Sequence, residues 1–155
     1  MKRSVLSILT VSGLLLLAGC GVSKPGARSY ALKATDIQGL GRILVDGAGY
    51  SLYVYLPDNQ GPSRCVSVCA EAWPPLVLPG GVQNAIAGPG VDAALVGTTR
   101  RSNGSLQVTY NRWPLYLYID DGRGQVNGQG EGMGAWYALS TSGAVDRQPV
   151  ASSNS

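Results

Sequence analysis

The sequence predicts an all-β domain made of two pseudo-symmetric β-hairpin or meander repeats that form a compact sandwich or barrel. The 22 Gly and 9 Pro among 155 residues favour many turns over long helices. Short runs with alternating apolar residues, at 50–56 and 113–119, are typical of strands. The chain also matches itself when it is shifted by 63 positions, which indicates an internal repeat.

The repeat extends without a gap over residues 41–76 and 104–139. It contains ten identities in 36 aligned positions, with a tryptophan in each copy. We therefore expect the two segments to fold as copies of one unit. The identical pairs are Gly41/Gly104, Val45/Val108, Leu52/Leu115, Tyr53/Tyr116, Tyr55/Tyr118, Asp58/Asp121, Gly61/Gly124, Ala72/Ala135, Trp73/Trp136 and Leu76/Leu139.

Each copy has the pattern of strands separated by turns. Turn signals lie at 46–49, at Asn103-Gly104 and at Asn111-Arg112. The segment 65–72 predicts one or two helical turns, which the prolines at 74 and 75 would end. The predicted strands are 42–45 and 50–56 in the first copy, and 95–101, 105–110, 113–119 and 136–139 in the second.

The N-terminus has the pattern of a bacterial lipoprotein signal. Lys2 and Arg3 precede an apolar run over residues 5–17, which is short for a membrane-spanning helix. The following Leu17-Ala18-Gly19-Cys20 resembles the lipobox, whose cysteine carries the lipid of the mature protein. The alternative is an ordinary secretory signal. We expect residues 1–19 to be a signal peptide and Cys20 to carry a palmitate-type membrane anchor.

This anchor predicts a domain that faces the periplasm or the exterior. Gly21 is not acidic, which favours the outer membrane if the cell has two membranes. The other predicted boundaries are 20–39 for the lipidated Cys20 and a tether, 40–76 for repeat 1, 77–94 for a connecting loop, 95–145 for repeat 2 and 146–155 for a disordered tail.

The charge of the chain argues against nucleic acid as a partner. The formal charge is +3, but Lys2 and Arg3 supply two of the positive charges. Residues 41–139 contain six Arg against seven Asp or Glu. A domain that binds nucleic acid would be expected to present a basic surface.

The repeated motif resembles a known family. The segments 53–58, YVYLPD, and 116–121, YLYIDD, both fit the pattern Y-x-[FWY]-x-x-D. This pattern, with C-x-x-x-C-x-x-x-W-P-P at 65–75, resembles bacterial lipoproteins built from the "secreted repeat of unknown function". The resemblance covers residues 40–140, departs at Arg112, where glycine is expected, and implies an architecture and a location without naming a reaction.

Histidine is missing from the sequence, which excludes catalytic triads and metal sites that depend on it. Asp58 and Asp121 leave a carboxylate-pair hydrolase as one alternative, because symmetry could bring them together. The other interpretation is that each carboxylate accepts backbone N–H groups and fixes its turn. No cofactor is expected.

The pair Cys65 and Cys69 predicts a disulfide in an exported domain. A structural role is the simpler interpretation, and a redox-active or metal-binding pair is the alternative. Closing so short a loop would contribute about 2 kcal/mol. The corresponding positions in the second copy are Gly128 and Gly132, so that copy is expected to fold without a disulfide.

The aromatic residues allow two interpretations. On a strand, Tyr53 and Tyr55 share one face, and Tyr116 and Tyr118 do so in the second copy. They could form a platform that stacks on sugars or binds a protein. They could instead pack across the pseudo-twofold interface with hydroxyl groups bonded to the backbone. The candidate binding surface consists of Tyr53, Tyr55, Trp73, Arg112, Tyr116, Tyr118 and Trp136.

A weaker candidate is an irregular cation site in the segment 120–131. Glycines occupy positions where an EF-hand loop has ligands, so this segment is not an EF-hand. Its oxygen-bearing candidates are Asp120, Asp121, Asn127 and Glu131.

Together these patterns predict a non-enzymatic binding or structural module of the cell envelope. Its partners would be the membrane, through Cys20, and an envelope glycan or protein. A redox, electron-transfer or metal-associated accessory protein is the first alternative, and the hydrolase is the second.

Overall fold

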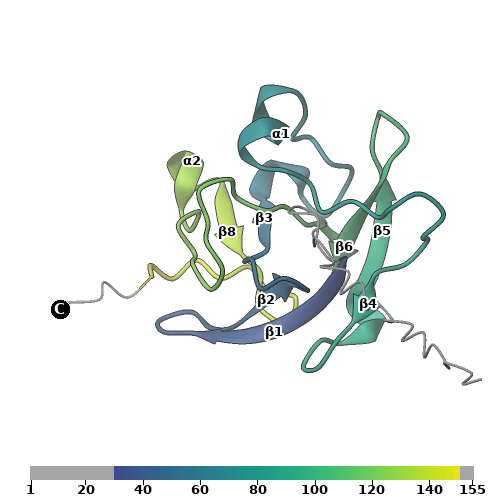
Figure 1. The fold of residues 1–155 in the computed structure, drawn as a ribbon. Coiled ribbons are helices and arrows are strands. Elements are labelled where there is room, and N and C mark those ends of the chain that lie inside the picture. Colours follow the sequence, from purple (N-terminus) through teal and green to yellow (C-terminus); the bar gives the residue numbers. More distant parts are fainter. Residues whose placement is uncertain (1–29, 151–155) are drawn as a thin grey trace, which may run out of the picture.

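The computed structural model describes residues 30–150. The predicted signal peptide and Cys20 lie outside these residues. Short strands in three sheets make up most of the regular structure, with few helical turns, as the sequence predicts (Figure 1). The three sheets stay open among the described residues. None of the helical turns within residues 30–150 has the length and apolar character of a transmembrane helix.

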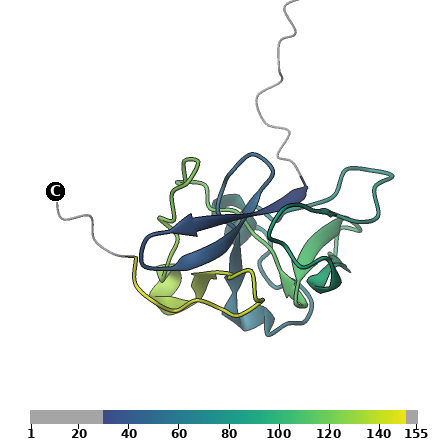
Figure 2. The ribbon, with the colours of Figure 1, turned by 90° about the horizontal axis from the view of Figure 1, so that it is seen from below.

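The first sheet has the order β2-β1-β4, the second β3-β8 and the third β5-β6-β7. Figure 2 shows β1 and β2 covering one side of the molecule. The strands are β1 (Ala31–Ile37), β2 (Gly41–Asp46), β3 (Tyr53–Tyr55), β4 (Ile86–Ala87), β5 (Val96–Arg100), β6 (Leu106–Tyr110), β7 (Trp113–Pro114) and β8 (Trp136–Ala138). The helical turns are η1 (Leu56–Asp58), α1 (Val68–Ala72), η2 (Ala93–Leu95) and α2 (Glu131–Gly134).

The predicted tether is wrong at its C-terminal end, because residues 31–37 form β1. This strand pairs antiparallel with β2, from Leu32 opposite Asp46 to Ile37 opposite Gly41. The sequence of β1, ALKATDI, lacks the apolar alternation that marks a strand, and only Leu32 of its seven residues is fully buried. Pairing with β2 and β4 specifies β1, and the sequence of residues 31–37 does not by itself reveal these pairings.

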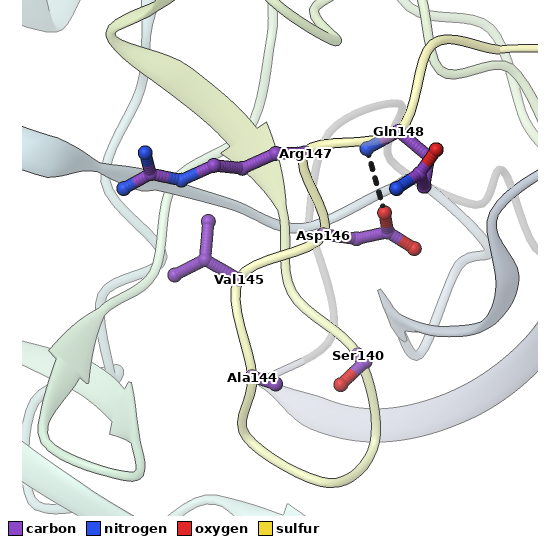
Figure 3. Close-up of a pocket in the computed structure, with 6 residues that line it drawn as sticks. All are labelled: Ser140, Ala144, Val145, Asp146, Arg147 and Gln148. Carbon is purple, nitrogen blue, oxygen red and sulfur yellow. Dashed lines mark hydrogen bonds between the residues drawn. The ribbon is translucent and has the colours of Figure 1, made fainter.

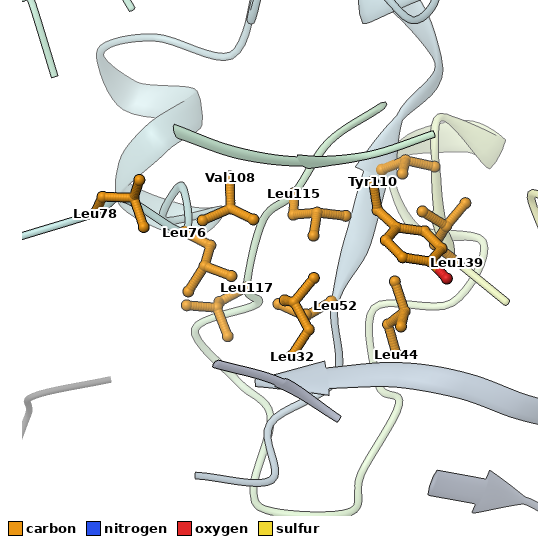
Figure 4. Close-up of a cluster of buried hydrophobic side chains, with 11 residues drawn as sticks. Leu32, Leu44, Leu52, Leu76, Leu78, Val108, Tyr110, Leu115, Leu117 and Leu139 are labelled. Carbon is orange, nitrogen blue, oxygen red and sulfur yellow. The ribbon is translucent and has the colours of Figure 1, made fainter. Parts of the chain in front are cut away.

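Two buried clusters form the core, and β3 separates them. The first is aliphatic except for Tyr110 and lies between the β1–β2 hairpin and β6 (Figure 4). Leu52 and Val54 point into it, whereas Tyr53 between them belongs to the second, aromatic cluster. Leu115, Tyr116 and Leu117 repeat this alternation. The predicted alternation of faces is therefore confirmed in both copies, although only Tyr53–Tyr55 of the segment 50–56 and Trp113–Pro114 of the segment 113–119 form strands.

The two repeats meet at a pseudo-twofold axis between Tyr53 and Tyr116. Each backbone N–H of this pair donates to the other's carbonyl oxygen, with both N···O distances at 2.9 Å. Two further backbone hydrogen bonds, related to each other by the 63-residue offset, flank this pair. Leu76 N donates to Leu115 O and Leu139 N to Leu52 O, at 2.9 and 3.2 Å. The segments predicted as long strands at 50–56 and 113–119 thus pair antiparallel through Tyr53 and Tyr116 at the centre of the fold.

The turn between β6 and β7 has an unusual residue. Tyr110 pairs with Trp113, which leaves Asn111 and Arg112 as a two-residue loop. Both have positive φ, 47° and 65°, as a type I′ hairpin requires. The equivalent of Arg112 in the first repeat is Gly49, with φ 92°. Arg112 is exposed, so its side chain gains little packing in return for this backbone conformation.

Replacing Arg112 with glycine is expected to raise the free energy of unfolding by about 1 kcal/mol, because a left-handed conformation costs a non-glycine residue about 1–2 kcal/mol. Chemical denaturation monitored by tryptophan fluorescence would measure the change. The matched control is Arg123→Gly, at an exposed position without positive φ, where the same change should destabilise the domain. Equal effects of the two substitutions would contradict the interpretation.

Candidate functional site

Two tyrosine–carboxylate hydrogen bonds cross between the repeats. The Tyr53 hydroxyl donates to Asp121 Oδ2, and the Tyr116 hydroxyl donates to Asp58 Oδ2, both at 2.6 Å. Each repeated motif therefore supplies the tyrosine for one bond and the aspartate for the other. All four residues are buried. Both hydroxyl groups donate to carboxylates, and the Tyr53 hydroxyl also accepts the backbone N–H of Gly128 at 3.2 Å. The predicted backbone partner is therefore found for Tyr53 only as a donor to its hydroxyl.

The second oxygen of each carboxylate holds the loop that follows it. Asp58 Oδ1 accepts the N–H of Arg64 at 2.7 Å, and Asp121 Oδ1 accepts the N–H of Asn127 at 2.8 Å. Both spans are six residues long, and the two bonds are related by the 63-residue offset. The predicted role of the aspartates in fixing their turns agrees with this geometry.

Burial shifts the proton equilibria of these groups. It raises the pKa of the Asp58 and Asp121 carboxyl groups above their ordinary value, although the tyrosine and backbone hydrogen bonds act in the opposite direction. Burial is also the main cause of the raised pKa of Tyr53 and Tyr116, and the adjacent carboxylates raise it further. The tyrosines therefore remain protonated donors well above neutral pH.

Four aromatic rings form a continuous stack across the same axis. The indoles of Trp73 and Trp136 are parallel, with centroids 3.9 Å apart and an interplanar angle of 2°. Tyr118 stacks on the outer face of Trp73 at 4.3 Å, and Tyr55 stacks on Trp136 at 4.5 Å. The order Tyr118–Trp73–Trp136–Tyr55 has the pseudo-twofold axis at its centre.

The two buried tyrosines meet this stack with their edges. Tyr53 contacts Trp73 at a centroid distance of 5.3 Å, and Tyr116 contacts Trp136 at 5.1 Å. Such edge-to-face pairs are favourable because the positive ring edge faces the negative ring face. Gly128 allows this packing, because a Cβ atom there would lie 2.6 Å from the Trp73 ring.

The structure thus brings six of the seven predicted surface residues together, but mostly inside the protein. Trp73 and Trp136 are 7% and 3% exposed, and Tyr53 and Tyr116 are fully buried. These four side chains are not available as a stacking platform. Tyr55 and Tyr118 are half-buried at the ends of the stack, and Arg112 is exposed in the β6–β7 turn.

The predicted disulfide joins Cys65 and Cys69, which is confirmed by an S–S distance of 1.97 Å. Cys65 is buried and belongs to the aromatic cluster. The disulfide links Cys65, which precedes α1, to Cys69 in its first turn. At the end of that helix the Trp73 N–H donates to Cys69 O.

The four candidate cation ligands do not form an oxygen cage. Both Asp121 oxygens accept internal hydrogen bonds, and Asn127 offers N–H donors to Asp121 Oδ1 and Asp120 O. Glu131 is exposed at the start of α2. Among residues 30–150 no group of three or more acidic or cysteine side chains is placed to hold a metal ion.

A pocket of about 310 Å³ lies where the chain leaves the fold (Figure 3). Asp146 Oδ1 accepts the N–H of Gln148 there, at 2.9 Å. The Gln129 side chain donates to the carbonyl oxygens of Asp146 and Gln148, both at 2.8 Å. These bonds hold the first residues of the predicted tail against the domain, while 151–155 lie outside the described residues.

One polar group that sequence reasoning missed is Arg101, a buried guanidinium beside the disulfide loop. Its equivalent in the first repeat is Gln38, which is exposed. A comparison of the copies for charged residues with no charged counterpart could have identified it.

Tyr53→Phe is expected to lower the free energy of unfolding by about 1–3 kcal/mol, because it leaves Asp121 Oδ2 buried without its donor. Tyr116→Phe should have a similar effect on Asp58. Tyr55→Phe is the matched control, since its ring also packs in the cluster but no hydrogen bond is found for its hydroxyl within residues 30–150. Denaturant unfolding of the three variants would test this, and equal effects at positions 53 and 55 would contradict it.

The raised pKa of Tyr53 and Tyr116 predicts alkaline instability. Above about pH 10 the unfolded tyrosines lose their protons while the folded ones keep them. The free energy of unfolding should therefore fall by about 1.4 kcal/mol per pH unit for each such tyrosine. Denaturation series from pH 8 to pH 11, with tyrosinate absorbance followed in parallel, would measure this fall. A constant stability over that range would contradict the prediction.

The comparisons with known proteins agree with the repeated architecture. A family model described as a secreted repeat of unknown function matches residues 34–77 and 97–140. The starts of the two matches lie 63 residues apart, as do their ends, which is the offset found in the sequence. Comparisons with curated proteins and with solved structures gave no match. The chain therefore belongs to the family built from the secreted repeat of unknown function.

Proposed function

We propose that this protein is a lipid-anchored, non-enzymatic module of the cell envelope that holds a rigid binding or structural domain near a membrane. The observation that supports this most directly is the engagement of both motif carboxylates. All four oxygens of Asp58 and Asp121 accept hydrogen bonds from within the domain. A catalytic carboxylate pair must reach substrate or water, so this arrangement does not favour the hydrolase.

The membrane attachment is assigned to Cys20. Ten residues, 21–30, separate this cysteine from the start of β1 at Ala31. An extended chain spans at most about 3.5 Å per residue, so such a linker would keep β1 within about 35 Å of the lipid. The family's description as secreted supports the envelope location that such an anchor would give.

Cys20→Ser is expected to abolish incorporation of labelled palmitate and to release the protein from the membrane fraction, because lipidation would have no acceptor thiol. Labelling in cells, followed by fractionation, measures both effects. The control is the double variant Cys65→Ser/Cys69→Ser, which should keep the label. A Cys20→Ser protein that is still labelled and membrane-bound would contradict the anchor.

The non-enzymatic part of the proposal is tested with the mature, full-length protein. A glycan array and a pull-down from envelope extracts should return a saturable partner. Turnover of an envelope glycan or peptide, with no bound partner in either experiment, would overturn the proposal. Loss of that turnover in Asp58→Asn and Asp121→Asn variants that remain folded would then favour the hydrolase.

The aromatic stack favours a second candidate, a redox or electron-transfer accessory protein. Parallel indoles at 3.9 Å with a tyrosine on each outer face provide overlapping rings between two half-buried positions. The reduction potential of Cys65–Cys69 and a thiol titration would separate the two functions. A strongly reducing couple with inaccessible thiols leaves the disulfide structural, whereas an exchangeable couple supports the redox role.

A further inference from the structure

The two repeats differ in polarity around Arg101. This side chain is 8% exposed. Its partners are Ser63, Cys65 and Gln107, whose counterparts in the other copy are Val126, Gly128 and Leu44. The symmetric frame therefore carries a buried cationic network in one half only.

The hydrogen-bond partners of Arg101 are all uncharged. Nη1 donates to Ser63 Oγ and Gln107 Oε1, and Nη2 donates to the carbonyl oxygen of Cys65. A guanidinium has five N–H donors, so these bonds account for three.

Asp58 interacts electrostatically with Arg101 but forms no direct hydrogen bond with it among the described residues. Arg101 lowers the pKa of Asp58 by its charge, against the larger effect of burial. A hydrogen-bond chain through the hydroxyl groups of Ser63 and Tyr116 connects the guanidinium to this carboxylate. Both Asp58 oxygens are already occupied. A buried cation in this state gains most from an anion that brings its own charge.

Arg101 lies in the wall of a pocket of about 460 Å³, larger than the pocket at 140–148. The disulfide loop and α1 form one wall through residues 66–70, and the hairpin at 101–105 forms another. Between them lie Pro75 and Val77. Val66 and Val77 are 45% and 40% exposed, so the pocket that Arg101 lines also offers accessible apolar surface.

We propose that this pocket binds the carboxylate of a small organic monoacid, with the carboxylate on Arg101 and its apolar group between the disulfide loop and Val77. This inference deepens the proposed binding function and rests on it. The planar guanidinium matches a carboxylate in geometry. Arg101 is the only charged residue among those that line the pocket. One positive charge suits a monoanion, and the apolar wall suits an organic substituent rather than inorganic phosphate.

Two sources have this chemistry, a free short-chain acid and the C-terminal residue of a peptide. Butyrate represents the first, and N-acetyl-alanine represents the second. N-acetyl-alaninamide is the matched uncharged probe. Titration of the full mature protein, followed by ¹H–¹⁵N NMR, should show saturable shifts of the amides at 66–70 and 101–105 with a carboxylate probe. We expect a Kd on the order of 1 mM for such small probes.

Ala70→Trp tests the site without altering Arg101. The indole would occupy the pocket and weaken binding at least about tenfold, which corresponds to about 1.4 kcal/mol. The matched control is Met133→Trp at the pseudo-symmetric position, which is fully exposed and should change the Kd less than about twofold. Arg101→Lys, if it folds, should also weaken binding, because an ammonium lacks the planar fork.

Each outcome supports or overturns the proposal. Binding of either carboxylate probe supports it, and the tighter of the two identifies the source. Saturation by the amide at the same concentration overturns the role of the charge, and an unchanged Kd in Ala70→Trp overturns the location. No saturable shift with either acid up to about 50 mM overturns the site, because this is far above the expected Kd. Palmitate labelling at Cys20 and the envelope pull-down are unaffected by that result, so failure of this site is distinguishable from failure of the proposed function.

Discussion

The exchange of hydrogen bonds between Tyr53 and Asp121, and between Tyr116 and Asp58, is the constraint on which the domain depends. Each aspartate fixes its own following loop with one oxygen and uses the other to hold a tyrosine from the opposite repeat. One repeat alone would leave a buried carboxylate and a buried hydroxyl without their partners, at a cost of about 1–3 kcal/mol for each unsatisfied group. The two copies are therefore mutually dependent, and the motif Y-x-[FWY]-x-x-D has to occur twice.

The aromatic packing follows from the same exchange. Tyr53 and Tyr116 lie on either side of the axis, and each packs its ring edge against the tryptophan of its own repeat. The two indoles then meet face to face. The central aromatic positions are thereby committed to the core, and little of their surface remains for recognition. Features that differ between the copies lie outside this shared frame. They include the disulfide, Arg101 and the Asn111-Arg112 turn, and they are the positions where a specific function can be carried without disturbing the fold.

Much of the architecture could be predicted from the repeat. The duplicated strands, the two-faced segments around Tyr53 and Tyr116, the short helix after Cys65 and the disulfide all follow from local pattern and from the 63-residue offset. The strand at Ala31–Ile37 could not, because its residues lack apolar alternation and only its hydrogen bonds to β2 and β4 define it. The sequence correctly grouped the residues of the candidate binding surface, because six of its seven side chains do meet. It did not predict that four of them are buried.

The sequence by itself determined that this protein is a duplicated β domain, because identity at a constant offset records two copies regardless of how they pack. Only the tertiary structure decided which tyrosine bonds which aspartate. A pairing within one repeat and an exchange between repeats require the same residues, and they differ only in how the two copies are placed around their axis. The set of uncharged acceptors around Arg101 was likewise a matter of packing, since Ser63, Cys65 and Gln107 come from segments that are apart in the chain.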